Sequence, residues 1–116
     1  MTETIEIINI IEQKSNEITA KLEILRTLEE QKIGIDEDIK KAKDKLKNED
    51  INKFTYGKMQ EINQKNLEEN TNERKKIWNE IADHINMISD RLNILKENYN
   101  KKAEIQDTPK IVEEKK

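Results

Sequence analysis

The sequence contains no cysteine, one proline and two glycines, and each shortage excludes a class of structure. Without cysteine the chain can form neither a disulfide framework nor a thiolate metal site. A fold rich in turns or β-strands needs more glycine and proline than this chain supplies. The single proline, Pro109, lies near the end of the sequence, so the residues before it can form long helices without a proline break.

Apolar side chains are also scarce, because hydrophobic residues make up 33% of the 116 residues and charged residues 41%. This supply is too small for a thick core, but it is sufficient for narrow seams between long helices. No apolar run approaches the length of a membrane span, and the first residues lack the basic segment of a signal peptide. We therefore expect a soluble, cytoplasmic protein.

Large apolar residues recur at alternating spacings of three and four between residues 78 and 99. This spacing is typical of a helix that buries one stripe against another helix, as in a coiled coil. The predicted seam consists of Trp78, Ile81, Ile85, Ile88, Leu92, Leu95 and Tyr99. One helix cannot hide this stripe from water, so another part of the chain has to cover it.

The first part of the chain carries a similar pattern, which continues across Gly34. Its apolar positions are Ile8, Ile11, Ile18, Leu22, Leu25, Leu28, Ile35, Ile39, Ala42 and Leu46. Gly34 either ends one helix before a second begins at Asp36, or lies inside a continuous or mildly bent helix. Because the heptad order is kept across the glycine, the sequence favours the continuous helix.

A turn is predicted between Asn48 and Asp50, where Asn48 ends the first helix and Asp50 caps the second. The first arm then covers 3–48 and the second 51–104, which together form a helical domain over 1–105. An antiparallel pairing about this turn joins residues whose numbers add to roughly 99, and it brings the two apolar patterns opposite each other. The charged residues 106–116 are predicted to be a disordered tail.

The predicted fold class is therefore all-α: a long antiparallel helical hairpin with a coiled-coil seam, a kink at Gly34 as the alternative, and association into a helical bundle. The association is inferred from apolar residues that lie outside the predicted seam, since such patches usually mark protein contacts. These candidate interaction residues are Ile5, Ile7, Ile10, Ile24, Ile77, Met87 and Ile94. Phe54 and Tyr56, beside the turn, either plug the end of the hairpin or form an exposed contact patch.

Catalytic and metal-binding patterns are lacking, which argues against an enzyme and against any cofactor. His84 is the single histidine, and it follows Glu80 by four residues rather than the three found in carboxylate-bridged metal bundles. The sequence has no glycine-rich phosphate loop and no nucleophile elbow. We expect no small-molecule substrate.

Two further patterns concern the surface. Asparagine recurs every seventh residue, at Asn72, Asn79, Asn86, Asn93 and Asn100. This row is either a polar strip or a hydrogen-bonding strip that a second chain reads. Lysine is frequent between residues 40 and 47, but acidic residues flank it and the net charge is −3, which argues against a dedicated nucleic-acid binder.

These observations favour a non-enzymatic coiled-coil assembly or scaffold protein that self-associates or binds a helical partner subunit. One alternative is a membrane-remodelling or nucleic-acid-associated helical module that uses the lysines. Another is a holdase chaperone, since a long helical hairpin resembles a prefoldin subunit in outline. The β-hairpins of prefoldin have no counterpart between Leu46 and Met59, so this resemblance concerns shape alone.

Overall fold

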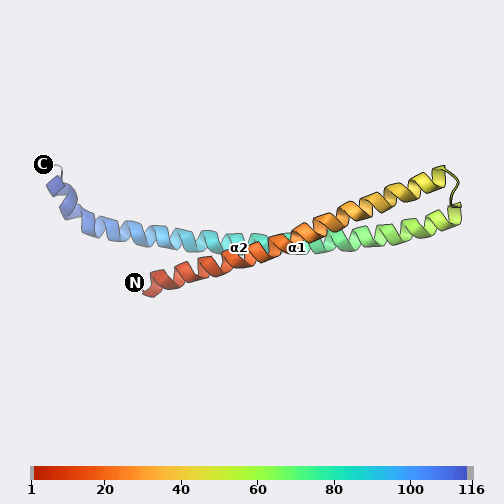
Figure 1. The fold of residues 1–116 in the computed structure, drawn as a ribbon. Coiled ribbons are helices and arrows are strands. Elements are labelled where there is room, and N and C mark those ends of the chain that lie inside the picture. Colours follow the sequence, from red (N-terminus) through yellow and green to blue (C-terminus); the bar gives the residue numbers. More distant parts are fainter. Residues whose placement is uncertain (1, 115–116) are drawn as a thin grey trace. The chain divides into compact units, whose positions relative to one another are not determined.

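The computed structural model describes the backbone of residues 2–114 and the side chains of residues 3–101. Two long helices, α1 (Thr2–Lys47) and α2 (Lys53–Glu114), are joined by a loop over residues 48–52 (Figure 1). The backbone over 2–114 contains no strand. The two helices form an antiparallel hairpin, which confirms the predicted all-α fold class.

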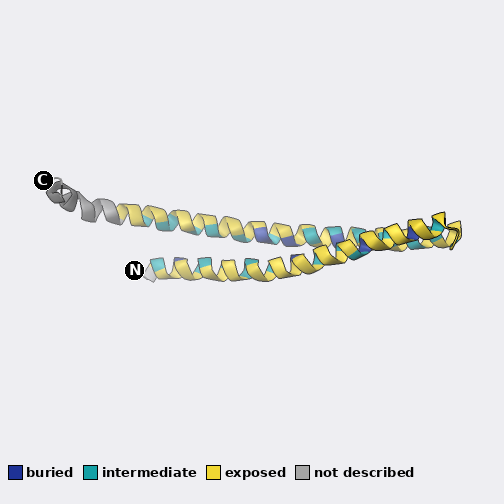
Figure 2. Ribbon diagram, turned by 45° about the horizontal axis from the view of Figure 1, so that its top comes forward, coloured by how far each residue is buried: buried dark blue, intermediate teal, exposed yellow. Residues whose placement is uncertain are grey.

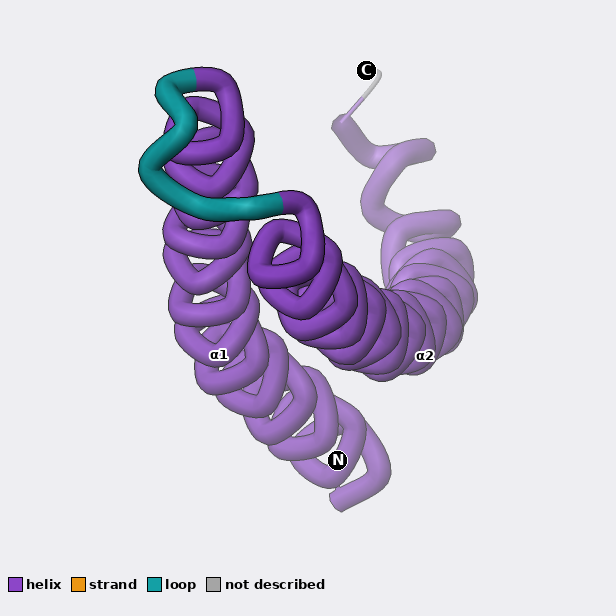
Figure 3. Tube along the Cα trace, turned by 90° about the vertical axis from the view of Figure 1, so that its right-hand side faces the viewer, coloured by secondary structure: helices purple, strands orange, loops and turns teal. Residues whose placement is uncertain are grey.

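The chain divides into two compact units, which are described separately below. Unit 1 pairs the start of α1, up to Ile18, with the part of α2 that begins at Ala82. Unit 2 comprises Thr19–Ile81 and contains the loop, which Figure 3 shows passing from the end of α1 to the start of α2. Each unit is a pair of helical segments, so each segment has one neighbour on which to bury its apolar side chains.

Helix α1 is continuous through Gly34, as the heptad order across this residue predicts. A Cβ atom added at Gly34 would have no heavy atom within 4 Å. No close approach of another segment therefore requires the missing side chain, and the helix accepts the modest cost of a glycine in its interior.

The loop closes α1 with backbone hydrogen bonds rather than with side chains. The amide of Asn48 donates to the Asp44 carbonyl and that of Asp50 to the Lys45 carbonyl, both at 2.9 Å. Between them Glu49 has a φ of 61°, the left-handed conformation that commonly ends a helix. The prediction that Asp50 caps the second helix is wrong, because its amide belongs to the closing turn of α1.

The cap of α2 is Asn52 instead. Its side-chain Oδ1 accepts a hydrogen bond of 2.8 Å from the amide of Thr55, three residues later. This is the ordinary N-cap geometry, and it satisfies one of the amides that have no partner at the start of a helix. Helix α2 therefore begins at Lys53, two residues later than the sequence predicts.

The core is a narrow seam in both units, with few fully buried side chains (Figure 2). In unit 2 the buried apolar residues are Leu25, Ile35, Ala42, Ile77 and Ile81, and in unit 1 Ile7 is buried. Along each helix the buried residues occupy two positions of a seven-residue repeat. Their separations are seven residues, four residues, or a multiple of seven plus three or four, as in a heptad seam.

The predicted seam of α2 differs from the observed one at one of its two heptad positions, which is shifted by one residue. Four of its seven members, Trp78, Ile85, Leu92 and Tyr99, are at least half exposed. The residues just before them take their places: Ile77 is buried, and His84, Arg91 and Asn98 are half-buried. Between Ile77 and Tyr99, three heptad positions of this helix are therefore candidates for the seam, and one partner helix covers only two of them.

The predicted register agrees with the cross-helix contacts within each unit. In unit 2, Lys21 pairs with Glu80 and Asn70 binds Gln31, so the partner numbers add to 101 in both pairs. In unit 1, His84 lies beside Glu17, with the same sum. The sum of roughly 99 expected from the sequence is thus correct to within two residues.

Helix α2 runs past residue 104, where the sequence predicts the end of the second arm, to Glu114. The predicted disordered tail, 106–116, falls on residues whose side chains lie outside the described residues, and positions 115 and 116 lie outside them altogether. The disorder of this tail stays a prediction.

Replacing Ile81 with alanine should lower the free energy of unfolding by about 2–4 kcal/mol, because its side chain is 2% exposed in the seam. Ile62 lies on the same helix and is 61% exposed, so Ile62→Ala should change stability by less than about 0.5 kcal/mol. Urea denaturation followed by circular dichroism measures both, and equal effects of the two substitutions would contradict the assigned seam.

Gly34→Ala should raise the free energy of unfolding by about 0.5–1 kcal/mol, because alanine costs less conformational entropy in a helix and the added Cβ meets open space. The same denaturation experiment measures the gain. A loss of stability would show that α1 is not a regular helix at this residue.

Candidate interaction surface

An exposed apolar stripe lies along one side of unit 1. We call it the outer stripe and define it by Ile5 and Ile8 on α1 and by Ile85, Leu92 and Tyr99 on α2. These five side chains are between 41% and 75% exposed. Large apolar residues scattered singly over a surface are ordinary, but a row at heptad spacing is a continuous face.

A groove between the two helices shows that both contribute to the same side of unit 1. Its lining consists of Thr4, Ile8, Leu95, Asn98 and Tyr99. Ile8 of α1 and Tyr99 of α2 therefore lie close together. Leu92 and Ile85 precede Tyr99 by seven and fourteen residues, so the helical repeat places them on the face of α2 that Tyr99 occupies.

The outer stripe carries little charge. Glu12 on α1 and Lys96 on α2 are exposed charged residues on this side, since each follows an outer-stripe residue by four positions. Ser89 lies between Ile85 and Leu92 at the same kind of spacing. One acidic and one basic side chain leave the face close to neutral, so it would not repel a second face of the same kind.

Unit 2 has exposed apolar residues at the corresponding heptad positions. Trp78 on α2 precedes Ile85 by seven residues, and Leu22 on α1 follows Ile8 by fourteen. They are 52% and 44% exposed, respectively. In unit 2 this heptad position is apolar at Leu22 and Trp78 alone, and the following or preceding heptads have Glu29 on α1 and Thr71 on α2 there.

Most of the candidate interaction residues predicted from the sequence are accessible. Ile5, Ile24, Met87 and Phe54 are exposed, and Ile10, Ile94 and Tyr56 are half-buried. Their accessibility is compatible with a role in binding a partner, and that role stays a prediction.

The prediction that Ile7 and Ile77 lie outside the seam is wrong. Ile7 is 3% exposed and Ile77 is 6% exposed, each within its own helix pair. On each helix the seam contains the residue just before the predicted one: Ile7 in place of Ile8 on α1, and Ile77 in place of Trp78 on α2. Neither side chain is available to a partner while its pair is intact.

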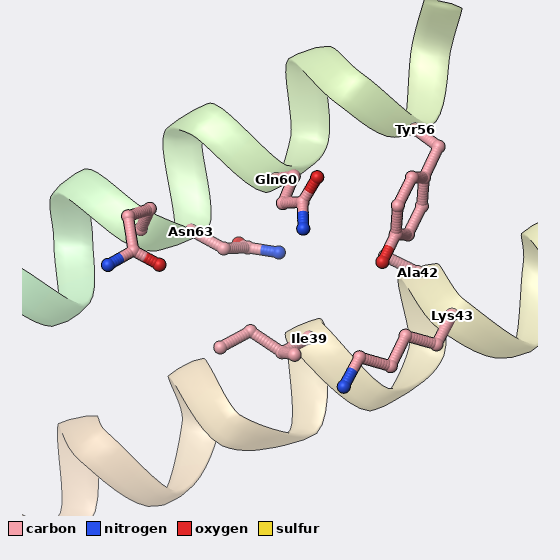
Figure 4. A pocket seen from close by; sticks show the side chains of 7 residues that line it. Ile39, Ala42, Lys43, Tyr56, Gln60 and Asn63 are labelled. Atoms are coloured by element: carbon pink, nitrogen blue, oxygen red, sulfur yellow. The ribbon is translucent and has the colours of Figure 1, made fainter. Parts of the chain in front are cut away.

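The two aromatic residues beside the loop have different environments. Tyr56 lines a cavity of about 180 Å³ between the helices of unit 2, and Figure 4 shows its ring reaching from α2 toward Ala42 on α1. Phe54 is 74% exposed, with the ammonium of Lys58 5.6 Å from its ring centroid. Tyr56 therefore fits the predicted plug, and Phe54 fits the exposed patch.

His84 lies in the seam of unit 1 rather than beside it. Its side chain is 17% exposed, and Nδ1 lies 3.3 Å from Oε2 of Glu17 without forming a hydrogen bond. Lys14 Nζ lies 3.2 Å from the same oxygen. The distance between His84 and Glu17 suits an ion pair when the imidazole is protonated, so the seam contains polar pairs as well as apolar ones.

No cluster of three histidine, aspartate or glutamate side chains among the described residues could hold a metal ion. No helix in the part of the chain covered by the structure has an apolar stretch long enough to cross a bilayer. What the surface offers is apolar area along two adjacent helices, which suits the binding of further helices.

The sequence reasoning missed the outer stripe because it placed Ile85, Leu92 and Tyr99 in the seam. One signal could have corrected this. The three-four spacing of Ile81 and Ile88 continues toward the start of α2 through Ile77, Arg74 and Asn70. This continuation is found only if polar residues are accepted as seam members.

Tyr56→Ala should lower the free energy of unfolding by about 1 kcal/mol, since the ring is half-buried against α1. Phe54→Ala should change it by about 0.5 kcal/mol or less, because that ring is mostly exposed. Thermal unfolding of the two variants provides the comparison. A larger loss for Phe54→Ala would reverse the assignment of plug and patch.

Comparisons of this chain with protein-family models, with curated proteins and with solved structures found no match, so the interpretation of this surface depends on its own residues.

Proposed function

We propose that this protein is a non-enzymatic assembly protein, and that two copies associate through their outer stripes to form a helical bundle. The observation that supports the proposal is the row of exposed apolar residues, Ile85, Leu92 and Tyr99, on α2 beside Ile8 on α1. In water this row is unfavourable, and burial against another apolar face removes the cost.

The width of the apolar pattern suits a bundle better than an isolated pair. A helix in a two-stranded coiled coil needs two apolar positions in seven, whereas a core-facing helix of a bundle uses about three. From Ile81 to Tyr99 the seam uses the position of Ile81 and Ile88 and a polar position that includes His84, and beside it lies a third, apolar position at Ile85, Leu92 and Tyr99. A further helix packed against these residues would use this third position.

A second copy of the chain is the occupant that fits this face best. The outer stripe is two helices wide, and a partner of matching width is another helix pair. A symmetric contact uses the same patch on both copies, which requires the patch to be self-complementary. The balance of Glu12 and Lys96 meets this requirement, since neither sign of charge dominates.

The expected strength follows from the residues involved. Full burial of one large aliphatic side chain contributes about 1.5–3 kcal/mol, and the outer stripe of each copy supplies several. Part of this gain offsets the loss of translational and rotational freedom on association. The remainder is consistent with a dissociation constant of micromolar or lower, which corresponds to a binding free energy on the order of 8 kcal/mol.

Replacing Ile85 and Leu92 together with glutamate should abolish this association, because burying two unpaired carboxylates opposes the contact. We expect the dissociation constant to rise by at least about 100-fold, equivalent to roughly 2.7 kcal/mol. Sedimentation equilibrium measures the change, and circular dichroism should show that the helices remain.

The matched control introduces the same charges one residue later, as Asn86→Glu and Asn93→Glu. Both asparagines are exposed and belong to the row that recurs every seventh residue. This variant should associate like the parent chain. A monomeric parent would contradict self-association and would favour a different helical subunit as the partner, and equal loss in both variants would contradict the outer stripe as the contact.

A further inference from the structure

A cluster of polar side chains interrupts the seam of unit 2. Among the side chains of residues 3–101, Asn70 is the buried polar one, with 3% of its surface exposed. The buried residues on either side along the seam are apolar: Leu25, Ile35 and Ile77. An amide at such a position reduces the apolar area that the seam buries. Asn70 is therefore expected to contribute to the specificity of the helix pairing rather than to hydrophobic burial.

The hydrogen bonds of Asn70 connect the two helices. Its Nδ2 donates to the backbone carbonyl of Leu28 and to Oε1 of Gln31, each at 2.9 Å. Its Oδ1 accepts a hydrogen bond of 2.8 Å from Nε of Arg74. Both N–H donors of the amide and one acceptor site are thus satisfied, as a buried amide requires.

Arg74 extends the cluster back to α1. Its Nη1 lies 3.5 Å from Oε1 of Glu29, and its Nη2 donates to Oγ1 of Thr71 at 3.2 Å. The arginine side chain is 20% exposed, so its charge is largely removed from water. Gln31 and Glu29 are therefore the two side chains of α1 that the cluster needs opposite Asn70 and Arg74.

The apolar pattern alone does not fix the register of this pair. A slip of the helices by one heptad brings seam positions against seam positions again, and apolar residues still meet apolar residues. Such a slip moves one helix along the other by about 10 Å, seven residues at 1.5 Å each. The polar side chains are the groups that distinguish the registers.

In one direction of slip, each α2 residue meets the α1 residue seven positions before its native partner. Asn70 then faces Ile24 in place of Gln31, and Arg74 faces Leu22 in place of Glu29. The amide loses its side-chain acceptor and the guanidinium loses its carboxylate. A buried polar group without its partner is unfavourable, and a charged one more so.

In the other direction, Asp38 and Asp36 replace Gln31 and Glu29, so the cluster keeps acceptors. The ion pair between Lys21 and Glu80 excludes this slip, because Glu80 would face Leu28. In the first slip Glu80 would meet Lys14 and keep a basic partner. The Asn70 cluster and the Lys21–Glu80 pair therefore exclude opposite directions.

We propose that the Asn70–Arg74 cluster, with Gln31 and Glu29, is a register-determining device that prevents α2 from slipping toward the start of α1. The Lys21–Glu80 pair prevents the opposite slip. This inference is independent of self-association, since all of its contacts lie within unit 2.

The test measures the register directly in the full chain. The protein has no cysteine of its own, so Asp44→Cys and Asn72→Cys provide two unique sites for spin labels on exposed faces of unit 2. A flexible glycine–serine insertion between Glu49 and Asp50 removes the contribution of the capped loop. Pulsed dipolar spectroscopy, with an excess of unlabelled chain, then reports the distance between the labels of one chain.

The decisive variant relocates the acceptors without changing the composition. Gln31 is exchanged with Ile24, and Glu29 with Leu22, so that the partners of Asn70 and Arg74 lie one heptad earlier. We expect the main distance to lengthen by about 10 Å, because α2 follows its partners along α1. Retention of the parent distance in this variant would overturn the proposal.

A second variant removes the cluster by Asn70→Leu and Arg74→Leu, which keeps the seam apolar. The parent should show one distance and this variant two, the second being longer. Asn63→Leu is the matched control, because Asn63 lies one heptad before Asn70, is half-buried and makes none of these hydrogen bonds. One unchanged distance in the double variant, with helicity retained, would also overturn the proposal.

Discussion

The structure depends on a geometric limit: a helix with one helical neighbour buries only about two positions in seven. Along the part of α2 that contains Ile88, α1 covers the heptad position of Ile88 and the polar position of His84 and Arg91, and it leaves the apolar position of Ile85 and Leu92 exposed. The outer stripe is therefore a direct result of which two positions the single partner helix covers.

Because the seam is narrow, each polar side chain in it has a large effect on how the two helices pair. A thick core would dilute the effect of one buried amide, but here Asn70 lies between a few apolar residues and the identity of its partners matters. Burial of polar groups contributes little to stability and a great deal to the choice among similar pairings. Stability and register are thus provided by different residues of one seam.

The sequence predicted the helices, the position of the loop and the register to within two residues, because heptad spacing and scarce glycine and proline are strong local signals. It did not predict which of two overlapping stripes on α2 is buried. Both stripes share Ile81, Ile88 and Leu95, and the all-apolar one is the better seam by composition. The buried stripe is the one that continues through Asn70 and Arg74, whose polar contacts with α1 periodicity cannot show. The cap at Asn52 was missed for a similar reason, since Asp50 is equally suitable by residue type.

The left-handed Glu49 at the end of α1 has a consequence for the connection between the helices. An L-residue with a side chain is disfavoured there, and glycine would adopt this conformation without strain. The chain accepts this cost in a loop of five residues, 48–52, that reverses its direction. Natural variation toward glycine at this site would therefore make the reversal easier and leave both helices unchanged.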